Sequence, residues 1–301
     1  MKLSLSIHAM ATRFELVLHG EDEVRLRAAG EEALREIERV EEQLSRYRRE
    51  SEIATLNRLA AHHPVRVSPP LFRLLEDCRQ FTAATAGAFD VTIGPLMRAW
   101  RFTEGSGGLP TPEDLEAARA VTGIEHLIFD PGSFTIAFDL PGVEIDLGGY
   151  GKGYAIDRAI EILREYGIGR ALLHGGTSSV AVIGPDTIEP AAWPIRLQYP
   201  LSPEPVNLHD QSLSVSTIHG RSFRDGEREY GHVIDPATGR PVEGTLAAAA
   251  VGRSATVCEV ISTALLVRGV EWLPEARVRF PGYQMQLACR DALGATVNTR
   301  I

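Results

Sequence analysis

The stretch of residues 144–184 constrains the fold more than any other part of the chain. A short apolar run that carries Asp146 breaks into the glycine-rich segment 148–153, and an amphipathic helical pattern follows at once. A second apolar run then ends in the pair Gly175-Gly176. Apolar runs punctuated by glycines in this order predict a strand–helix–strand unit with a tight turn at each end.

Two glycine turns on one such unit indicate an anion site. Glycines let backbone N–H groups approach a ligand, and a helix N-terminus offers unpaired donors and the positive end of its dipole. The first turn contains Gly148 and Gly149, and the second contains Gly175 and Gly176. Lys152 follows the first pair and favours a phosphate as the anion. The alternative is that the turns only connect the strands and the helix.

The composition limits the class of protein. The 301 residues suffice for one elaborate domain, 1–301, or for two intimately packed halves. A net charge of −9 argues against nonspecific binding of nucleic acid. No apolar run approaches the roughly 20 residues of a membrane span, and the N-terminus shows neither a signal peptide nor a lipobox cysteine, so we expect a cytoplasmic protein. Three cysteines without metal or redox spacing are expected to be buried, reduced thiols.

Hydrophobic periodicity predicts strands and helices along the whole chain. The expected helices are 21–44, a short one from Ser51, 69–86 and 254–268, and Val24 is placed on the apolar face of the first. The expected strands are 3–9, 12–18, 127–130, 134–139, 143–145, 171–173, 192–199, 205–208, 213–216, 230–234 and 247–251, with a closing hairpin of 277–288 and 295–300.

The helix from Ser254 carries an acid and a hydroxyl in an apolar setting. Glu259 and Thr263 are four residues apart, which places them on one helix face. A carboxylate among so many apolar neighbours needs a partner. That partner is either an arginine from elsewhere or a hard cation, which prefers oxygen ligands beside a phosphate.

Other polar side chains allow a structural and a functional interpretation. His232 and Asp235 are either a structural histidine with a turn carboxylate or a general base with its orienting acid. Asp90 and Thr92 fit a capping or Asx-type turn. Tyr47 is either a surface residue or a ring stacked on a heterocycle. Weaker candidates for the role of base are His174 and His219.

In order along the chain, these segments resemble those of the ApbE family, the FAD:protein FMN transferases. The resemblance runs from Met10 to Gly269, and GAFDVTIGPLMRAW (87–100) is its most specific piece. MATRF (10–14), SRYRRESEIATLN (45–57) and IDLGGYGKGYAIDRA (145–159) are similar to family segments as well. So are the second glycine pair, GHVIDPATGRPV (231–242) and the helix from Ser254.

The resemblance implies an α/β (α+β) fold with T-fold-like architecture, in which mixed or antiparallel sheets pack with helices. It also implies Mg²⁺-dependent transfer of the FMN moiety of FAD to a threonine hydroxyl, with release of AMP. The implied partner is an acceptor flavoprotein subunit or domain that bears the target threonine. Two rival functions stay open: an FAD pyrophosphatase that releases FMN and AMP, and a catalytically impaired FAD-binding protein.

Site residues carry over by position in the resemblance. The metal ligands fall on the carbonyl of Gly151 and the side chains of Glu259 and Thr263, and His232 and Asp235 fall near the reacting phosphorus. The residues implied for cofactor binding are Tyr47, Asp90, Thr92, Gly148, Gly149, Lys152, Gly175, Gly176 and Thr177.

The sequence departs from the family pattern at four places. Glu259 stands where the family has Asp, Gly151 where it has Ala, and Thr177 where it has Asn or Asp. The family's Thr-Ser-Gly segment is replaced by STIHG, residues 216–220. Three of these changes lie near the expected metal or phosphates, so they bear on catalysis and metal affinity more than on the fold.

Overall fold

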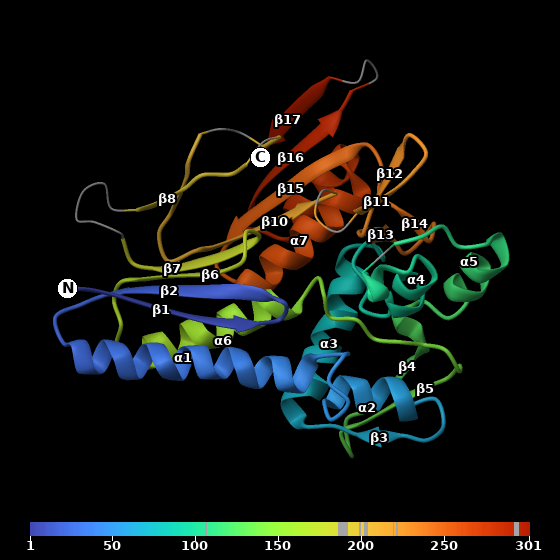
Figure 1. The fold of residues 1–301 in the computed structure, drawn as a ribbon, viewed down its shortest axis with the longest axis horizontal. Coiled ribbons are helices and arrows are strands. Elements are labelled where there is room, and N and C mark those ends of the chain that lie inside the picture. The colour runs from blue at the N-terminus through green and yellow to red at the C-terminus, as the bar shows by residue number, and fades with distance from the viewer. Residues whose placement is uncertain are drawn as a thin grey trace.

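A single eight-stranded antiparallel sheet forms the centre of the protein (Figure 1). The computed structural model describes residues 1–105, 107–185, 192–198, 200–201, 204–218, 220, 222–291 and 295–301. In spatial order, the strands are β1 (Lys2–Ala9), β2 (Thr12–His19), β6 (Ala171–Gly175), β7 (Ser179–Ile183), β10 (Ser212–Thr217), β15 (Thr245–Gly252), β16 (Gln284–Arg290) and β17 (Thr296–Arg300). Each neighbouring pair is antiparallel, which confirms the expected fold class.

The sheet is built from two successive sets of elements with the same order. In the first set, β1 and β2 precede helices α1 (Glu23–Leu44) and α6 (Gly151–Glu165), and β6 and β7 follow. In the second, β10 and β15 precede α7 (Ala255–Arg268) and α8 (Leu273–Arg279), and β16 and β17 follow. Helices α1 and α6 pack together beside β1 and β2, and α7 packs on β10 and β15 (Figure 1).

Helix α1 shows how local sequence directs this packing. The Asp22 side chain caps it by accepting from the Arg25 amide at 3.1 Å. Its buried face begins at Leu26 and continues at helical spacing to Leu44. The expectation for Val24 was wrong, because its side chain is 80% exposed. Val24 is two positions from Leu26, and residues two apart lie on opposite sides of a helix.

Two long insertions leave this framework. The first, between α1 and α6, contains α2 (Glu52–Leu59), β3 (Val65–Arg66), α3 (Pro69–Ala84), α4 (Gly94–Ala99), α5 (Pro112–Arg119), β4 (Leu127–Asp130) and β5 (Thr135–Phe138). The second, between β10 and β15, contains β11 (Ser222–Asp225), β12 (Arg228–Gly231), β13 (Ile234–Asp235) and β14 (Arg240–Pro241). The segment between β7 and β10 carries the small pair β8 (Trp193–Ile195) and β9 (Val206–Leu208). No helix in these described parts of the chain is long and apolar enough to cross a membrane.

The expected strand 143–145 is absent. The strands β4 and β5 of the first insertion form a small sheet whose third strand is β3, in the order β3-β5-β4. The side-chain amide of Asn57 takes the place of a strand partner. Its Nδ2 donates to the Ile145 carbonyl at 2.9 Å, and its Oδ1 accepts from the Ile145 amide at 2.7 Å. A buried backbone must satisfy its polar groups, and here one side chain satisfies both.

The expected closing hairpin also begins later than predicted. Residues 277–279 form the last turn of α8, and the Phe280 amide donates to the Ala276 carbonyl at 2.8 Å. Gly282 then takes a positive φ of 83° before β16 begins at Gln284. The predicted strand 192–199 is shortened to β8, and residue 199 lies outside the described residues.

The two insertions meet at a turn of the second one. The indole Nε1 of Trp100 donates to the Gly239 carbonyl at 2.8 Å, and Arg119 Nη2 donates to the Ala237 carbonyl at 2.9 Å. The rings of Trp100 and Tyr230 lie 5.6 Å apart, and Tyr230 stacks on Phe223 at 5.1 Å. The GPLMRAW segment and the HVIDPATG segment, far apart in sequence, are therefore held side by side.

Helices α6 and α7 approach each other closely at their N-termini. A Cβ at Gly153 would lie 2.6 Å from the Ala255 carbonyl oxygen, so no larger residue fits there without movement. Asp157 of α6 accepts from the backbone amides of Ala255 and Thr256 at 2.7 and 2.9 Å, and from the hydroxyl of Ser254 at 2.7 Å. A carboxylate at the first turn of a helix is favoured by unpaired amides and by the helix dipole.

We expect Gly153→Ala to lower the free energy of unfolding by about 1–3 kcal/mol, because the added methyl overpacks a backbone contact. The matched control is Gly151→Ala, where nothing lies within 4 Å of an added Cβ. That change should stabilise the protein by about 0.5–1 kcal/mol through helix propensity. Urea denaturation of both variants measures the difference, and equal stabilities would show that the helices can separate freely at Gly153.

Candidate functional site

The first glycine turn packs against the middle of α7. Its Gly148 amide donates to Asp146 Oδ1 at 2.8 Å, and the Gly151 amide donates to the Leu147 carbonyl at 2.8 Å, where α6 begins. A Cβ at Gly149 would lie 3.5 Å from the hydroxyl of Thr263. The turn thus places Gly149 beside α7, while a Cβ at Gly151 would meet open space.

Glu259 is the buried anion at the centre of this region, with 3% of its surface exposed. Its Oε2 accepts from the Gly153 amide at 2.9 Å. Its Oε1 accepts from the Ser179 hydroxyl at 2.8 Å and pairs with Lys152 Nζ at 3.0 Å. The sequence allowed an arginine or a hard cation as the partner of this carboxylate, and in the structure the lysine ammonium neighbours it.

The second glycine turn reaches the same carboxylate. The Gly176 amide donates to the Arg13 carbonyl at 2.9 Å, and Gly176 has a positive φ of 62°. Thr177 is exposed at the tip of the turn, and Ser179 begins β7 two residues later. A Cβ at Gly175 would lie 2.6 Å from Phe14, so the strand needs a glycine there. Both glycine turns therefore lead to Glu259, one through Gly153 and the other through Ser179.

Thr263 is at one end of a row of hydroxyl groups. Its Oγ1 lies 3.4 Å from Ser216 Oγ, and Ser216 Oγ lies 2.9 Å from Ser262 Oγ. Ser262 is fully buried and donates to Ser214 at 3.3 Å. Strand β10 and helix α7 thus share a row of hydroxyls beside Glu259, which offers uncharged oxygen donors and acceptors.

The oxygen atoms that a hard cation prefers are present among these residues, and their role as metal ligands stays a prediction. The donor set is one buried carboxylate, the Thr263 hydroxyl and the carbonyls of the glycine turn, all of them oxygen atoms. Among the described residues, no group of three or more His, Cys, Asp or Glu side chains could hold a metal ion by itself. Magnesium is commonly held by one or two carboxylates together with substrate phosphates, so a site with one carboxylate suits Mg²⁺ on a diphosphate.

Asp90 and Thr92 form a brace within the first insertion. Asp90 Oδ1 accepts from the amide and the hydroxyl of Thr92 at 2.8 and 2.6 Å, and its Oδ2 accepts from the Ile124 amide at 3.0 Å. Thr92 Oγ1 in turn accepts from the Gly123 amide at 2.7 Å. Burial raises the pKa of Asp90, although these hydrogen bonds oppose the shift. The geometry is that of the expected Asx-type turn, and a role toward FAD stays a prediction.

Arg46 joins the segment that bears Tyr47 to the first glycine turn. Its guanidinium pairs with Glu144 and lies 2.5 Å from Asp146 Oδ2, and the three side chains are 10–14% exposed. Burial disfavours the charged form of Arg46, but Asp146 and Glu144 outweigh it and raise the pKa. The Tyr47 ring is 65% exposed, with the Arg46 guanidinium carbon 5.6 Å from its centroid. An exposed, anchored ring is consistent with either interpretation of Tyr47.

The structure brings His232 and Asp235 to the junction of the two insertions. Asp235 Oδ1 accepts from the Ala237 amide at 2.9 Å and so fixes the turn that docks on Trp100. His232 is half-buried, and its ring and that of Phe102 are nearly perpendicular, with the ring centroids 6.5 Å apart. Asp235 therefore orders the turn that follows it, and the roles of His232 and Asp235 in catalysis stay predictions.

The weaker histidine candidates have different outcomes. His174 Nε2 lies 2.9 Å from Glu15 Oε2, and its Nδ1 lies 3.1 Å from the Gly176 carbonyl, so it supports the second glycine turn. His219 lies outside the described residues.

Of the cysteines, Cys78 and Cys258 are buried free thiols whose pKa is raised by burial, and Cys289 is half-buried.

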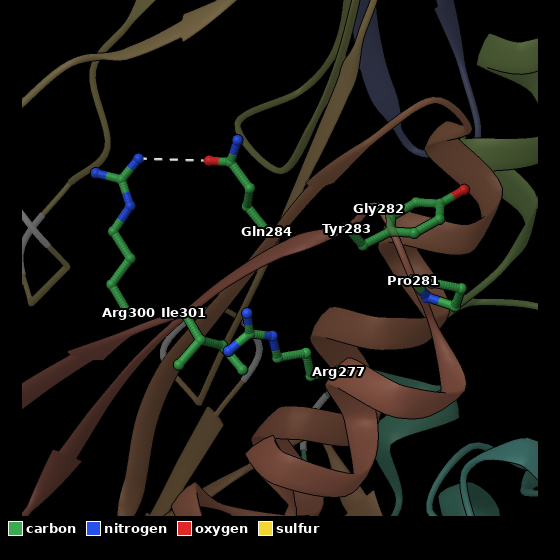
Figure 2. Close-up of a pocket in the computed structure, with 7 residues that line it drawn as sticks. All are labelled: Arg277, Pro281, Gly282, Tyr283, Gln284, Arg300 and Ile301. Atoms are coloured by element: carbon green, nitrogen blue, oxygen red, sulfur yellow. Dashed lines mark hydrogen bonds between the residues drawn. The ribbon is translucent and has the colours of Figure 1, made fainter.

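A surface hollow lies elsewhere, beside the closing hairpin (Figure 2). Its lining residues are Arg277, Pro281, Gly282, Tyr283, Gln284, Arg300 and Ile301. A Cβ at Gly252 would lie 2.1 Å from the Tyr283 ring, so the hollow adjoins the Gly252 end of β15. Ser216, which neighbours Thr263, pairs with Ala248 toward the other end of β15. None of the expected site residues lines this hollow.

Comparison with known proteins identifies the family. The family model described as "ApbE family" matches residues 10–283. This chain belongs to the ApbE family. A Vibrio cholerae protein named FAD:protein FMN transferase is 30% identical over 244 residues, which are 78% of this chain and 72% of that protein. The Escherichia coli K12 protein of the same name is 28% identical over 294 residues, or 94% and 82% of the two chains.

Solved structures agree with this assignment. The crystal structure of an ApbE protein from Thermotoga maritima has a TM-score of 0.87 and 27% identity, and the match covers 99% of this chain and 97% of that one. The flavin transferase ApbE from Vibrio cholerae has a TM-score of 0.82 and 26% identity, with coverage of 100% and 97%. Both the expected ApbE membership and the expected architecture are therefore confirmed, and the relatives are transferases.

Sequence reasoning did not identify three residues near the glycine turns as candidates for the site. Arg46, Asp157 and Ser179 each form short, buried or half-buried polar contacts at the glycine turns or at α7. A serine that begins an apolar strand directly after a glycine turn was a usable signal for Ser179. Arg46 lies in a segment with several arginines, so nothing local distinguishes the one that becomes buried.

We expect Arg46→Ala to lower the free energy of unfolding by about 3–5 kcal/mol, because it leaves two largely buried carboxylates without this counter-charge. The control is Arg98→Ala. Arg98 lies 2.7 Å from Glu144 but is 57% exposed, and exposed ion pairs contribute about 0–1 kcal/mol. Chemical denaturation compares the two, and equal losses would contradict the anchoring role of Arg46.

Proposed function

We propose that this ApbE-family chain is a Mg²⁺-dependent FAD:protein FMN transferase. The threonine oxygen of an acceptor protein would bond to the phosphorus of the FMN half, and the bond from that phosphorus to the bridging oxygen would break. AMP leaves with that oxygen, and the threonine proton passes to a base. The observation that carries this proposal is the convergence of both glycine turns on Glu259, beside Lys152.

Lys152 and the two glycine turns are the proposed holders of the FAD diphosphate. The ammonium has three donor hydrogens, so it can keep Glu259 as a partner and still donate to a phosphate oxygen. Thr177 is exposed at the tip of the second turn, where a ligand can reach it. The N-terminus of α6, which has no capping side chain from Tyr150, adds the positive end of its dipole.

The carbonyl of Gly151 and the side chains of Glu259 and Thr263 are the proposed ligands of Mg²⁺. When bound, the ion would neutralise charge on the diphosphate during transfer. Gly151 has space for the alanine that the family pattern places there, so this departure leaves the carbonyl of the turn in place. Glu259 is longer by one methylene than the aspartate of that pattern and is held by hydrogen bonds on both oxygens.

His232 is the proposed acceptor of the threonine proton, and Asp235 fixes the turn beside it. An FAD pyrophosphatase would use the same phosphorus with water in place of threonine, and an impaired protein would bind FAD without reaction. The names of the relatives in Vibrio cholerae and Escherichia coli favour transfer to protein over both alternatives.

The proposal is tested with purified protein, FAD, MgCl₂ and a peptide that carries the family's acceptor threonine. We expect AMP to appear together with flavinylated peptide in equal amounts, and both to disappear when EDTA is added. AMP without flavinylated peptide would identify a pyrophosphatase. Bound FAD with neither product would identify a binding protein and overturn the proposed activity.

Glu259→Ala should reduce the Mg²⁺-dependent rate by about 100-fold or more, because metal assistance contributes several kcal/mol of transition-state stabilisation. Glu259→Asp, which restores the residue of the family pattern, should keep the metal requirement. Glu161→Ala is the control, since Glu161 is 55% exposed on α6. AMP release against MgCl₂ concentration is the measurement. An unaltered rate and metal requirement in Glu259→Ala would make the metal assignment wrong.

His232→Ala should slow AMP release by about 10²–10⁴-fold, the usual contribution of a general base. FAD affinity, measured by fluorescence quenching, should stay within about threefold of the original protein. His209→Ala serves as control because its side chain is 54% exposed on the surface. Loss of FAD binding in His232→Ala would instead assign His232 to ligand contact or to structure.

A further inference from the structure

Ser179 occupies an unusual position for a serine. It is fully buried at the first position of β7, directly after the second glycine turn. Its backbone pairs with Gly175 on β6 and with Ser214 on β10, so the residue sits inside the central sheet. Its hydroxyl donates to Glu259 Oε1 at 2.8 Å. A buried hydroxyl aimed at a buried carboxylate is a charge-assisted hydrogen bond, which is stronger than a neutral one.

The donors to Glu259 come from two directions. Gly153 and Lys152 belong to α6 and approach from the first glycine turn. Ser179 belongs to the sheet and approaches from the second turn. The backbone amide of Gly153 holds Oε2. Oε1 has two partners, and because the ammonium of Lys152 is on a flexible side chain, the Ser179 hydroxyl is the one that fixes the rotation of the carboxylate relative to the sheet.

The length of Glu259 explains why such a contact is needed. Glutamate has one more rotatable bond than the aspartate of the family pattern, so its carboxylate loses more rotamer freedom when it is fixed. Groups that hold a metal-ligating carboxylate by hydrogen bonds commonly change metal affinity by about 10–100-fold when they are removed. A fixed donor on Oε1 lowers the number of orientations in which the carboxylate can face a cation.

We propose that Ser179 is a positioning residue for Glu259 in the divalent-cation site. The hydroxyl holds the carboxylate of the longer glutamate side chain in the orientation that an aspartate would reach without this hydrogen bond. Because Ser179 is two residues from Thr177, the same contact ties the second glycine turn to α7. This inference rests on the proposed function, since it assumes that Glu259 binds the cation.

The test is isothermal titration of MgCl₂ into the FAD-loaded full-length protein. We expect Ser179→Ala to raise the Kd for Mg²⁺ by about tenfold. Ser133→Ala is the matched control, because the exposed Ser133 hydroxyl also donates to a carboxylate, Asp130 Oδ2 at 2.6 Å, but lies in the turn between β4 and β5. It should leave the Kd within about twofold. If Ser179→Ala folds poorly, Ser179→Cys keeps the size with a weaker donor, and a raised Kd is expected again.

The same substitution, made in the Glu259→Asp variant, distinguishes a positioning role of Ser179 from general damage to the fold. In Glu259→Asp, the shorter carboxylate lies further from β7, so adding Ser179→Ala should change the Kd by less than about twofold. An unchanged Kd in Ser179→Ala or Ser179→Cys, or an equal loss in both backgrounds, overturns the inference. If Glu259→Ala itself leaves Mg²⁺ binding unchanged, the proposed metal site fails and the inference falls with it.

Discussion

The close contact between α6 and α7 is the constraint on which the rest of the site depends. Each helix supplies a carboxylate to the first turn of the other: Glu259 accepts from Gly153 of α6, and Asp157 accepts from Ala255 and Thr256 of α7. Buried helix ends need such partners, because their first amides have no acceptor within the helix. The missing Cβ of Gly153 lets the two ends come close enough for both contacts.

This reciprocal capping links the two sets of elements that build the sheet. Helix α6 belongs to the first set and α7 to the second, so the candidate cation site lies where the sets join. The insertions of the two sets meet in the same way, through the hydrogen bond from Trp100 to Gly239. Segments that resemble family motifs, although scattered over the chain, thus become neighbours through a few polar contacts rather than through one local structure.

Much of the fold could be predicted because its signals are local. The strands 3–9 and 12–18 follow from alternation, and the helix 254–268 follows from a long apolar run that ends at Gly269. The structure confirms all three within a residue or two. The expected strand 143–145 and the first residues of the closing hairpin were wrong. At residues 143–145, the backbone amide and carbonyl of Ile145 bond to the side-chain amide of Asn57, which is distant in sequence, instead of to a neighbouring strand.

The motifs of the sequence resembled those of the ApbE family. By itself, the sequence also determined most of the elements, the two glycine turns, and the acid and hydroxyl on one face of α7. Those features depend on residue spacing, which a single chain displays directly. Only the tertiary structure decided that both turns reach Glu259, that Lys152 and Ser179 are its partners, and that Asp90 and Thr92 bond each other. The reason is physical: a buried charge is satisfied by whichever donors the packing brings within about 3 Å, and that choice has no local signature.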